Sequence, residues 1–147
     1  MLNTFYCWLE QISLPLARFS LFLVYFWFGI LKVVGLSSAE QPVYDLHAKT
    51  ISFIPFHFFF IAFSLFECLI GVLFLVKGAE KAVFPLFIFH MITTTLPLVL
   101  LPGTAWSAPF VPTLIGQYIV KNIVLIAVAV FVVTKATKAI NKLEGAV

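Results

Sequence analysis

Six polar side chains lie inside the long apolar runs of this sequence, and their types are the ones that can do chemistry. They are Arg18, Lys32, Glu67, His90, Lys121 and Asn122. A carboxylate, an imidazole and an ammonium held together away from water can neutralise one another, exchange a proton or bind a polar head group. A charged side chain at the centre of a bilayer costs at least about 2.5–3.5 kcal/mol on insertion scales, so each charge there is expected to have an oppositely charged partner or a functional role.

The composition of the chain indicates that these runs cross a membrane. Of the 147 residues, 63% are hydrophobic and 10% are charged, and the mean hydropathy is +1.13. Soluble domains carry roughly 25% charged residues, so the sequence predicts a polytopic membrane protein whose first partner is the lipid bilayer. The net charge is +3, and most of the Lys and Arg residues flank apolar runs, a pattern typical of membrane topology and not of nucleic-acid binding.

Four apolar runs predict four transmembrane helices, at about residues 14–36, 55–76, 82–101 and 113–134. Each has roughly the 20 residues that an α-helix needs to cross the hydrocarbon core. We therefore expect an all-α, four-helix transmembrane bundle, in a single domain over residues 1–147 with an amphiphilic N-terminus and a basic C-terminal tail. Residues 37–54 and 102–112 are expected to be linkers. Because the segment before Arg18 is long and carries Glu10, we expect no cleaved signal peptide.

The positive charges predict an orientation for this bundle. Four spans place both ends of the chain on one side, and most basic residues fall there. That side carries Arg18, Lys77, Lys81, Lys135, Lys138 and Lys142, whereas the other side carries Lys49 and, at its edge, Lys32. The positive-inside rule therefore predicts that both termini are cytoplasmic.

The helical rise of 1.5 Å per residue converts sequence position into depth. Counted from the cytoplasmic ends of the expected spans, Glu67 and His90 lie ~13 Å in, and Lys121 and Asn122 lie ~18–20 Å in. We therefore expect Glu67 to pair with Lys121 of the fourth helix, at a level shared with His90. Two interpretations stay open for this set: an ion pair that fixes helix register, or a polar cavity for a proton, a head group or a small polar ligand.

The remaining polar residues have simpler interpretations. Arg18, at ~6 Å, is interpreted as a flanking residue that snorkels to the interface, and Lys32, at ~27 Å, either snorkels or joins the cluster. His90 is favoured as a neutral hydrogen-bond donor between helices. Residues 93–95, all threonines, are expected to donate hydrogen bonds from their hydroxyls to backbone carbonyls one turn back.

Four glycines are expected to allow close helix packing: Gly29, Gly35, Gly71 and Gly116.

No metal or cofactor is expected to be held by this chain alone. Its three histidines show neither the HxxH nor the HxxxH spacing, and they fall at different depths or on different elements. Neither a nucleotide-binding loop nor a nucleophile–base pair is present in the sequence. The chain is therefore not expected to be an enzyme by itself.

The same residues carry a resemblance to a family. The run Arg18-Phe-Ser-Leu-Phe-Leu-Val-Tyr-Phe-Trp-Phe-Gly-Ile-Leu-Lys32 resembles the first helix of the DoxX-like small membrane proteins, and is closest to the YkgB branch. Glu67-Cys-Leu-Ile-Gly71 resembles the Glu-x-x-x-Gly of their second helix. Residues 93–97 and 116–125 resemble the third and fourth helices, with Lys121-Asn122 where the family usually has Lys-Asp. The resemblance covers roughly residues 18–133.

The resemblance implies a four-helix bundle of the inner (plasma) membrane, in a family whose roles are poorly defined. Some members are similar to subunits of quinone-linked oxidoreductases, and others are tied to oxidative or reactive-chlorine stress. Three functions follow as expectations. The first is an accessory or stress-linked membrane component with a polar intramembrane cluster. The second is a membrane subunit that binds a quinone beside a redox partner protein. The third is a small-molecule or proton-coupled transporter that acts as a homo-oligomer.

Overall fold

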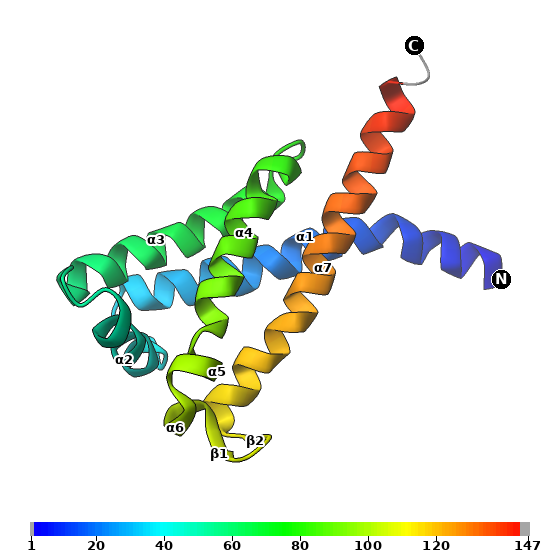
Figure 1. Cartoon of the computed structure of the whole chain (residues 1–147). Coiled ribbons are helices and arrows are strands. Elements are labelled where there is room, and N and C mark those ends of the chain that lie inside the picture. The colour runs from blue at the N-terminus through cyan, green and yellow to red at the C-terminus, as the bar shows by residue number, and fades with distance from the viewer. Residues whose placement is uncertain (1, 145–147) are drawn as a thin grey trace.

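Four long helices form the body of the protein in the computed structural model (Figure 1). They are α1 (Leu2–Val33), α3 (Phe56–Leu75), α4 (Glu80–Thr95) and α7 (Leu114–Glu144). Each provides a stretch that is long and apolar enough to cross a membrane, and the third stretch continues through the short helix α5 (Pro97–Leu100). The prediction of an all-α, multi-pass four-helix bundle is confirmed. The structure describes residues 2–144, with side chains for residues 4–138, so the side chain of Lys142 lies outside the described residues.

The helices at the two ends of the chain are longer than expected. α1 begins at Leu2 instead of near residue 14, so the amphiphilic segment expected to precede the first helix forms its first three turns. The helix ends at Val33, where Gly35 adopts a φ of +72°. There the amide of Leu36 donates to the carbonyl of Leu31 at 2.8 Å, and the amide of Gly35 donates to the carbonyl of Lys32 at 3.2 Å. This is a Schellman cap, so Gly35 serves as a helix terminator and not as the packing residue we expected.

Both segments predicted to be linkers contain regular structure. Residues 37–54 include α2 (Glu40–Thr50), with an acidic residue in its first turn and basic residues in its last, as the helix dipole favours. Residues 102–112 form α6 (Pro102–Ala105) and a hairpin of β1 (Trp106–Ala108) and β2 (Val111–Pro112). Figure 1 shows α2, α5, α6 and the hairpin at one end of the bundle and the α3–α4 turn at the other. We call these the hairpin end and the turn end.

The beginning of α1 and the last turns of α7 both lie toward the turn end (Figure 1). Two ion pairs mark this end: Arg18 of α1 with Glu80 of α4, and Lys135 of α7 with Glu10 of α1 at 3.3 Å. This arrangement is the one that four successive crossings require.

Each long helix buries one stripe of residues spaced three and four apart. The stripes are Arg18, Leu21, Tyr25, Gly29 and Lys32 on α1; Phe60, Ser64, Glu67, Gly71 and Phe74 on α3; and Glu80, Val83, Phe87 and His90 on α4. This spacing places a stripe on one helix face. The polar residues of α1, α3 and α4 are therefore directed into the bundle, and an apolar layer that includes Leu21, Phe74 and Phe87 lies among them.

The most extensive helix contact is between α1 and α3, and it depends on two glycines. A Cβ at Gly71 would lie 2.9 Å from the backbone nitrogen of Phe26, and one at Gly29 would lie 2.6 Å from the sulfur of Cys68. A Cβ at Gly116 would collide with the backbone of Ala105. The expected packing role is thus confirmed at Gly29, Gly71 and Gly116.

Candidate functional site: the Glu67 network

Glu67 lies at the centre of a chain of side-chain hydrogen bonds that joins three helices. Its Oε2 accepts from the ammonium of Lys32 on α1, and its Oε1 lies 2.8 Å from Nε2 of His90 on α4. The hydroxyl of Tyr25 on α1 lies 3.2 Å from Nδ1 of the same imidazole. We call Lys32, Glu67, His90 and Tyr25 the Glu67 network. Because an ionised carboxylate only accepts, His90 donates through Nε2, and a neutral ring then accepts the Tyr25 hydroxyl at Nδ1.

The network is buried and electrically balanced. Lys32 is 7% exposed, Glu67 and His90 are each 5% exposed, and Tyr25 is 4% exposed. The ammonium of Lys32 and the carboxylate of Glu67 carry opposite charges that offset each other. A buried carboxylate is costly unless it is paired and its lone pairs are satisfied, and both Glu67 oxygens have a partner here.

Lys32 joins the network although it stands in the last turn of α1. Because Cα–Cβ bonds tilt toward the N-terminus of a helix, its side chain leans back into the bundle and away from the nearby interface. The interpretation that Lys32 joins the cluster is the one that the structure supports, because its ammonium is bound to Glu67. His90 has the interhelical hydrogen bond that was expected of it.

The expected pair of Glu67 with Lys121 is wrong. Lys121 is exposed, and its ammonium lies 5.1 Å from the ring centroid of Tyr118, one turn earlier on α7. Among the described side chains no ion pair of Lys121 is found. The error arose because α7 continues to Glu144, so depth counted back from residue 134 misplaced Lys121. Asn122 is half-buried and stands outside the Glu67 network.

Arg18 belongs to a second buried pair and is not a snorkelling residue. Its guanidinium pairs with Glu80, and its Nη1 donates to the carbonyls of Phe74 at 3.0 Å and Val76 at 3.3 Å. Arg18 is 8% exposed and Glu80 is 4% exposed. The carbonyls at the end of α3 have no partner within their own helix, so they are natural acceptors for an inward-facing guanidinium.

Two residues of these clusters were not singled out from the sequence, namely Tyr25 and Glu80. A signal for each was present. Tyr25 stands seven residues after Arg18 and seven before Lys32, which puts all three on one face of α1. Glu80 begins the three-and-four spacing that leads through Val83 to His90. The depth of a residue along its helix does not tell which face of the helix it occupies, so depth alone predicts neither Tyr25 nor Glu80.

The expectation for the three threonines is confirmed. The hydroxyls of Thr93, Thr94 and Thr95 donate to carbonyls three residues back, at 2.7, 3.1 and 2.9 Å. They belong to the helix backbone of α4 and not to the site. Within the described part of the chain, no cluster of three His, Cys, Asp or Glu side chains could hold a metal ion.

Aromatic rings surround the imidazole of His90. The ring of Phe63 stacks on it with centroids 5.0 Å apart and planes at 18°, and Phe66 lies 6.3 Å away. Both phenylalanines are on α3 and are half-buried. Phe66 in turn contacts Phe89 of α4, which is 60% exposed. Aromatic side chains therefore connect the buried imidazole with the outer surface between α3 and α4.

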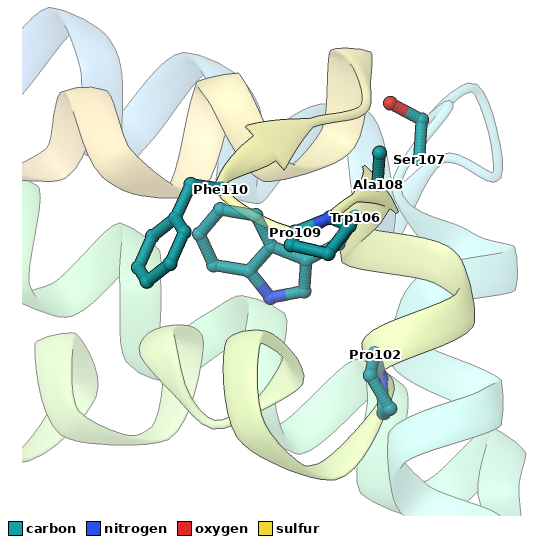
Figure 2. A pocket seen from close by; sticks show the side chains of 6 residues that line it. All are labelled: Pro102, Trp106, Ser107, Ala108, Pro109 and Phe110. Carbon is teal, nitrogen blue, oxygen red and sulfur yellow. The ribbon is translucent and has the colours of Figure 1, made fainter.

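A shallow apolar hollow of about 450 Å³ lies away from this network, at the hairpin end. Figure 2 shows Trp106, Pro109 and Phe110 gathered on the hairpin, with Pro102 on α6 nearby. No titratable side chain lines the hollow, so its chemistry is that of an apolar surface. The chemistry-bearing groups of the protein are those of the Glu67 network and the Arg18–Glu80 pair.

The fold and these buried clusters together define a multi-pass, all-α membrane protein. No family model, curated protein or solved structure matches the chain.

Proposed function

We propose that this protein is a non-enzymatic accessory component of the inner membrane, DoxX-like and closest to the YkgB branch, whose Glu67 network is an internal proton-exchange site. The family assignment rests on the sequence motifs of its four helices. The proposal that both termini are cytoplasmic rests on its basic residues, because Lys77 and Lys81 stand at the α3–α4 turn and Lys135 and Lys138 stand near the end of α7, which lies toward the turn end.

The observation that carries the proton-exchange function is the order of groups in the network. A phenol, an imidazole, a carboxylate and an ammonium are joined by consecutive hydrogen bonds. The imidazole lies between the phenol and the carboxylate, with Nδ1 facing the Tyr25 hydroxyl and Nε2 facing the Glu67 carboxylate. A proton that arrives at Nδ1 makes an imidazolium beside the Glu67 carboxylate, and the proton on Nε2 can then pass to that carboxylate. Intramembrane chains of Glu and His are typical of proton relays.

Infrared difference spectroscopy of the protein in lipid, recorded while the pH is lowered, tests this proposal. We expect a band of a protonated carboxylic acid to appear and to be absent in Glu67→Gln. We also expect His90→Gln to shift the pH at which it appears, because the neighbouring imidazole is lost.

Glu80→Gln is the matched control, since Glu80 is the other buried carboxylate and lies outside the network. The band should persist in that variant. A band that disappears in Glu80→Gln and persists in Glu67→Gln would contradict the proposal, as would a spectrum without any protonated carboxyl between neutral pH and the onset of unfolding.

The aromatic rings around His90 favour a second candidate function, a membrane subunit of a quinone-linked oxidoreductase. Phe63 and Phe66 provide ring faces against which a planar head group can stack, and the N–H groups of His90 and Lys32, which Glu67 accepts in this structure, would be redirected to its carbonyl oxygens. Organic extracts of the protein purified with its native lipids are then expected to contain quinone, together with a flavin or iron–sulfur partner protein. His90→Leu should reduce the quinone content, whereas His57→Leu, which changes an exposed histidine of α3, should not.

A further inference from the structure

The core-facing stripe of α7 changes from buried to exposed along the helix. The positions Leu114, Tyr118, Lys121, Leu125, Ala129, Val132 and Ala136 follow one another at intervals of three and four residues. Ala129 and Val132 are fully buried, whereas Tyr118 is 62% exposed and Leu114 is 67% exposed. The face that packs into the bundle near the turn end therefore continues uncovered to the hairpin end.

Lys121 stands on the uncovered part of this stripe, within a membrane-spanning helix. It follows Leu114 by seven residues, which places its backbone ~10 Å below the start of α7. Its ammonium lies over the ring of Tyr118, so the side chain extends one turn toward the hairpin end. This direction carries the charge toward the interface, as lysines in membranes prefer. Gln117, on the same turn as Tyr118, is exposed beside it.

A second copy of the chain offers no carboxylate at this depth. Among the described acidic side chains, Glu67 and Glu80 are buried in their own ion pairs, and Glu10 lies toward the turn end. Glu40 and Asp45 are on α2, outside the four spanning stretches. Within the spanning stretches of the described chain, therefore, no carboxylate is placed to pair with Lys121, which leaves its ammonium available to an anion of another molecule.

We propose that the hairpin-end half of α7 binds an anionic phospholipid, with the phosphate on Lys121 and with Tyr118 and Gln117 beside it. The order of the side chains favours a lipid over a partner helix. The polar groups occupy the turns nearest the hairpin end, and on the same face the next exposed position toward the membrane centre is the apolar Val124, three residues after Lys121. A phospholipid has this same order, with its head group at the interface and acyl chains beneath it. The site is independent of the Glu67 network.

Native mass spectrometry of the protein in detergent, supplemented with phosphatidylglycerol or with phosphatidylcholine, tests this site. We expect the wild type to retain phosphatidylglycerol in preference to phosphatidylcholine. Lys121→Gln should lower the retention of phosphatidylglycerol about fivefold, the factor expected for one lysine near an anionic surface. Because Lys121 is exposed, the variant should fold, and an unchanged thermal midpoint verifies this.

Lys49→Gln is the control, because Lys49 is also an exposed lysine at the hairpin end and donates to the carbonyl of Leu100. It should retain phosphatidylglycerol as the wild type does. Equal retention by the wild type and Lys121→Gln would overturn the proposal, and so would equal retention of the two lipids by the wild type. A second protein that co-purifies with the wild type and is lost in Lys121→Gln, with lipid retention unchanged, would assign the surface to a partner helix instead.

Discussion

Replacing Glu67 by glutamine is expected to destabilise the protein by about 3–5 kcal/mol, the range found when one partner of a buried ion pair is removed. The cost arises because the ammonium of Lys32 stays buried at 7% exposure with no carboxylate to neutralise it. Lys32→Met should be similarly harmful, because it leaves the Glu67 carboxylate with the neutral imidazole of His90 as its remaining partner. The free energy of unfolding, measured by chemical denaturation in micelles, provides the test.

Combining the two changes should recover much of the loss, because Lys32→Met with Glu67→Gln removes both charges together. The coupling energy of this double-mutant cycle is therefore expected to be large. The matched cycle of Glu67→Gln with Lys121→Met should be additive, since Lys121 is exposed and its ammonium lies over Tyr118. Additive losses for Lys32 and Glu67, with coupling for Lys121, would show that the carboxylate has the other partner.

Lys32 and Lys121 show which features of the site can be predicted from the sequence and which cannot. Apolar length identified the four spans, and the cost of intramembrane charge identified Glu67 as a residue that needs a partner. The choice of partner depended on depth, which is counted from helix ends, and those ends were misjudged at α1 and α7. Lys121 also stands on the core-facing stripe of α7 by its spacing. No local pattern tells that this stripe is uncovered at the hairpin end, because that depends on how the helices diverge.

The Arg18–Glu80 pair was missed for a related reason. Charges beside a short turn at the membrane surface are usually solvated, so the position of Glu80 between Lys77 and Lys81 does not by itself predict burial. Its position at the first turn of α4 places it on the same face as Val83 and His90, and this face is buried. Helix α2 was missed because residues 37–54 have a polar composition, and its packing on α3 and α5 is a tertiary effect.

Replacing Arg18 by methionine is expected to cost about 3–5 kcal/mol in the free energy of unfolding. The change leaves the Glu80 carboxylate buried, and it also removes the donor to the carbonyls of Phe74 and Val76. Arg18→Lys should recover only part of the loss, because a single ammonium cannot reproduce the fork of a guanidinium that reaches three acceptors. The surface pair of Glu10 and Lys135 at the same end is the control, and Glu10→Gln should cost less than about 1 kcal/mol. If Arg18→Lys had the same free energy of unfolding as the wild type, the three-acceptor role of the Arg18 guanidinium would be contradicted.

The two buried clusters should also behave independently of each other. Arg18 and Tyr25 are separated by seven residues, a rise of ~10.5 Å along α1, and Leu21 and Phe87 lie in the apolar layer between the clusters. At such a separation, and without a shared partner, the costs of Arg18→Met and Glu67→Gln are expected to add within about 0.5 kcal/mol. Additivity would mean that the Arg18–Glu80 pair fastens the turn end without influencing the proton-exchange site. Coupling between them would instead require that the apolar layer transmits a rearrangement, and the Glu67 network would then respond to events at the turn end.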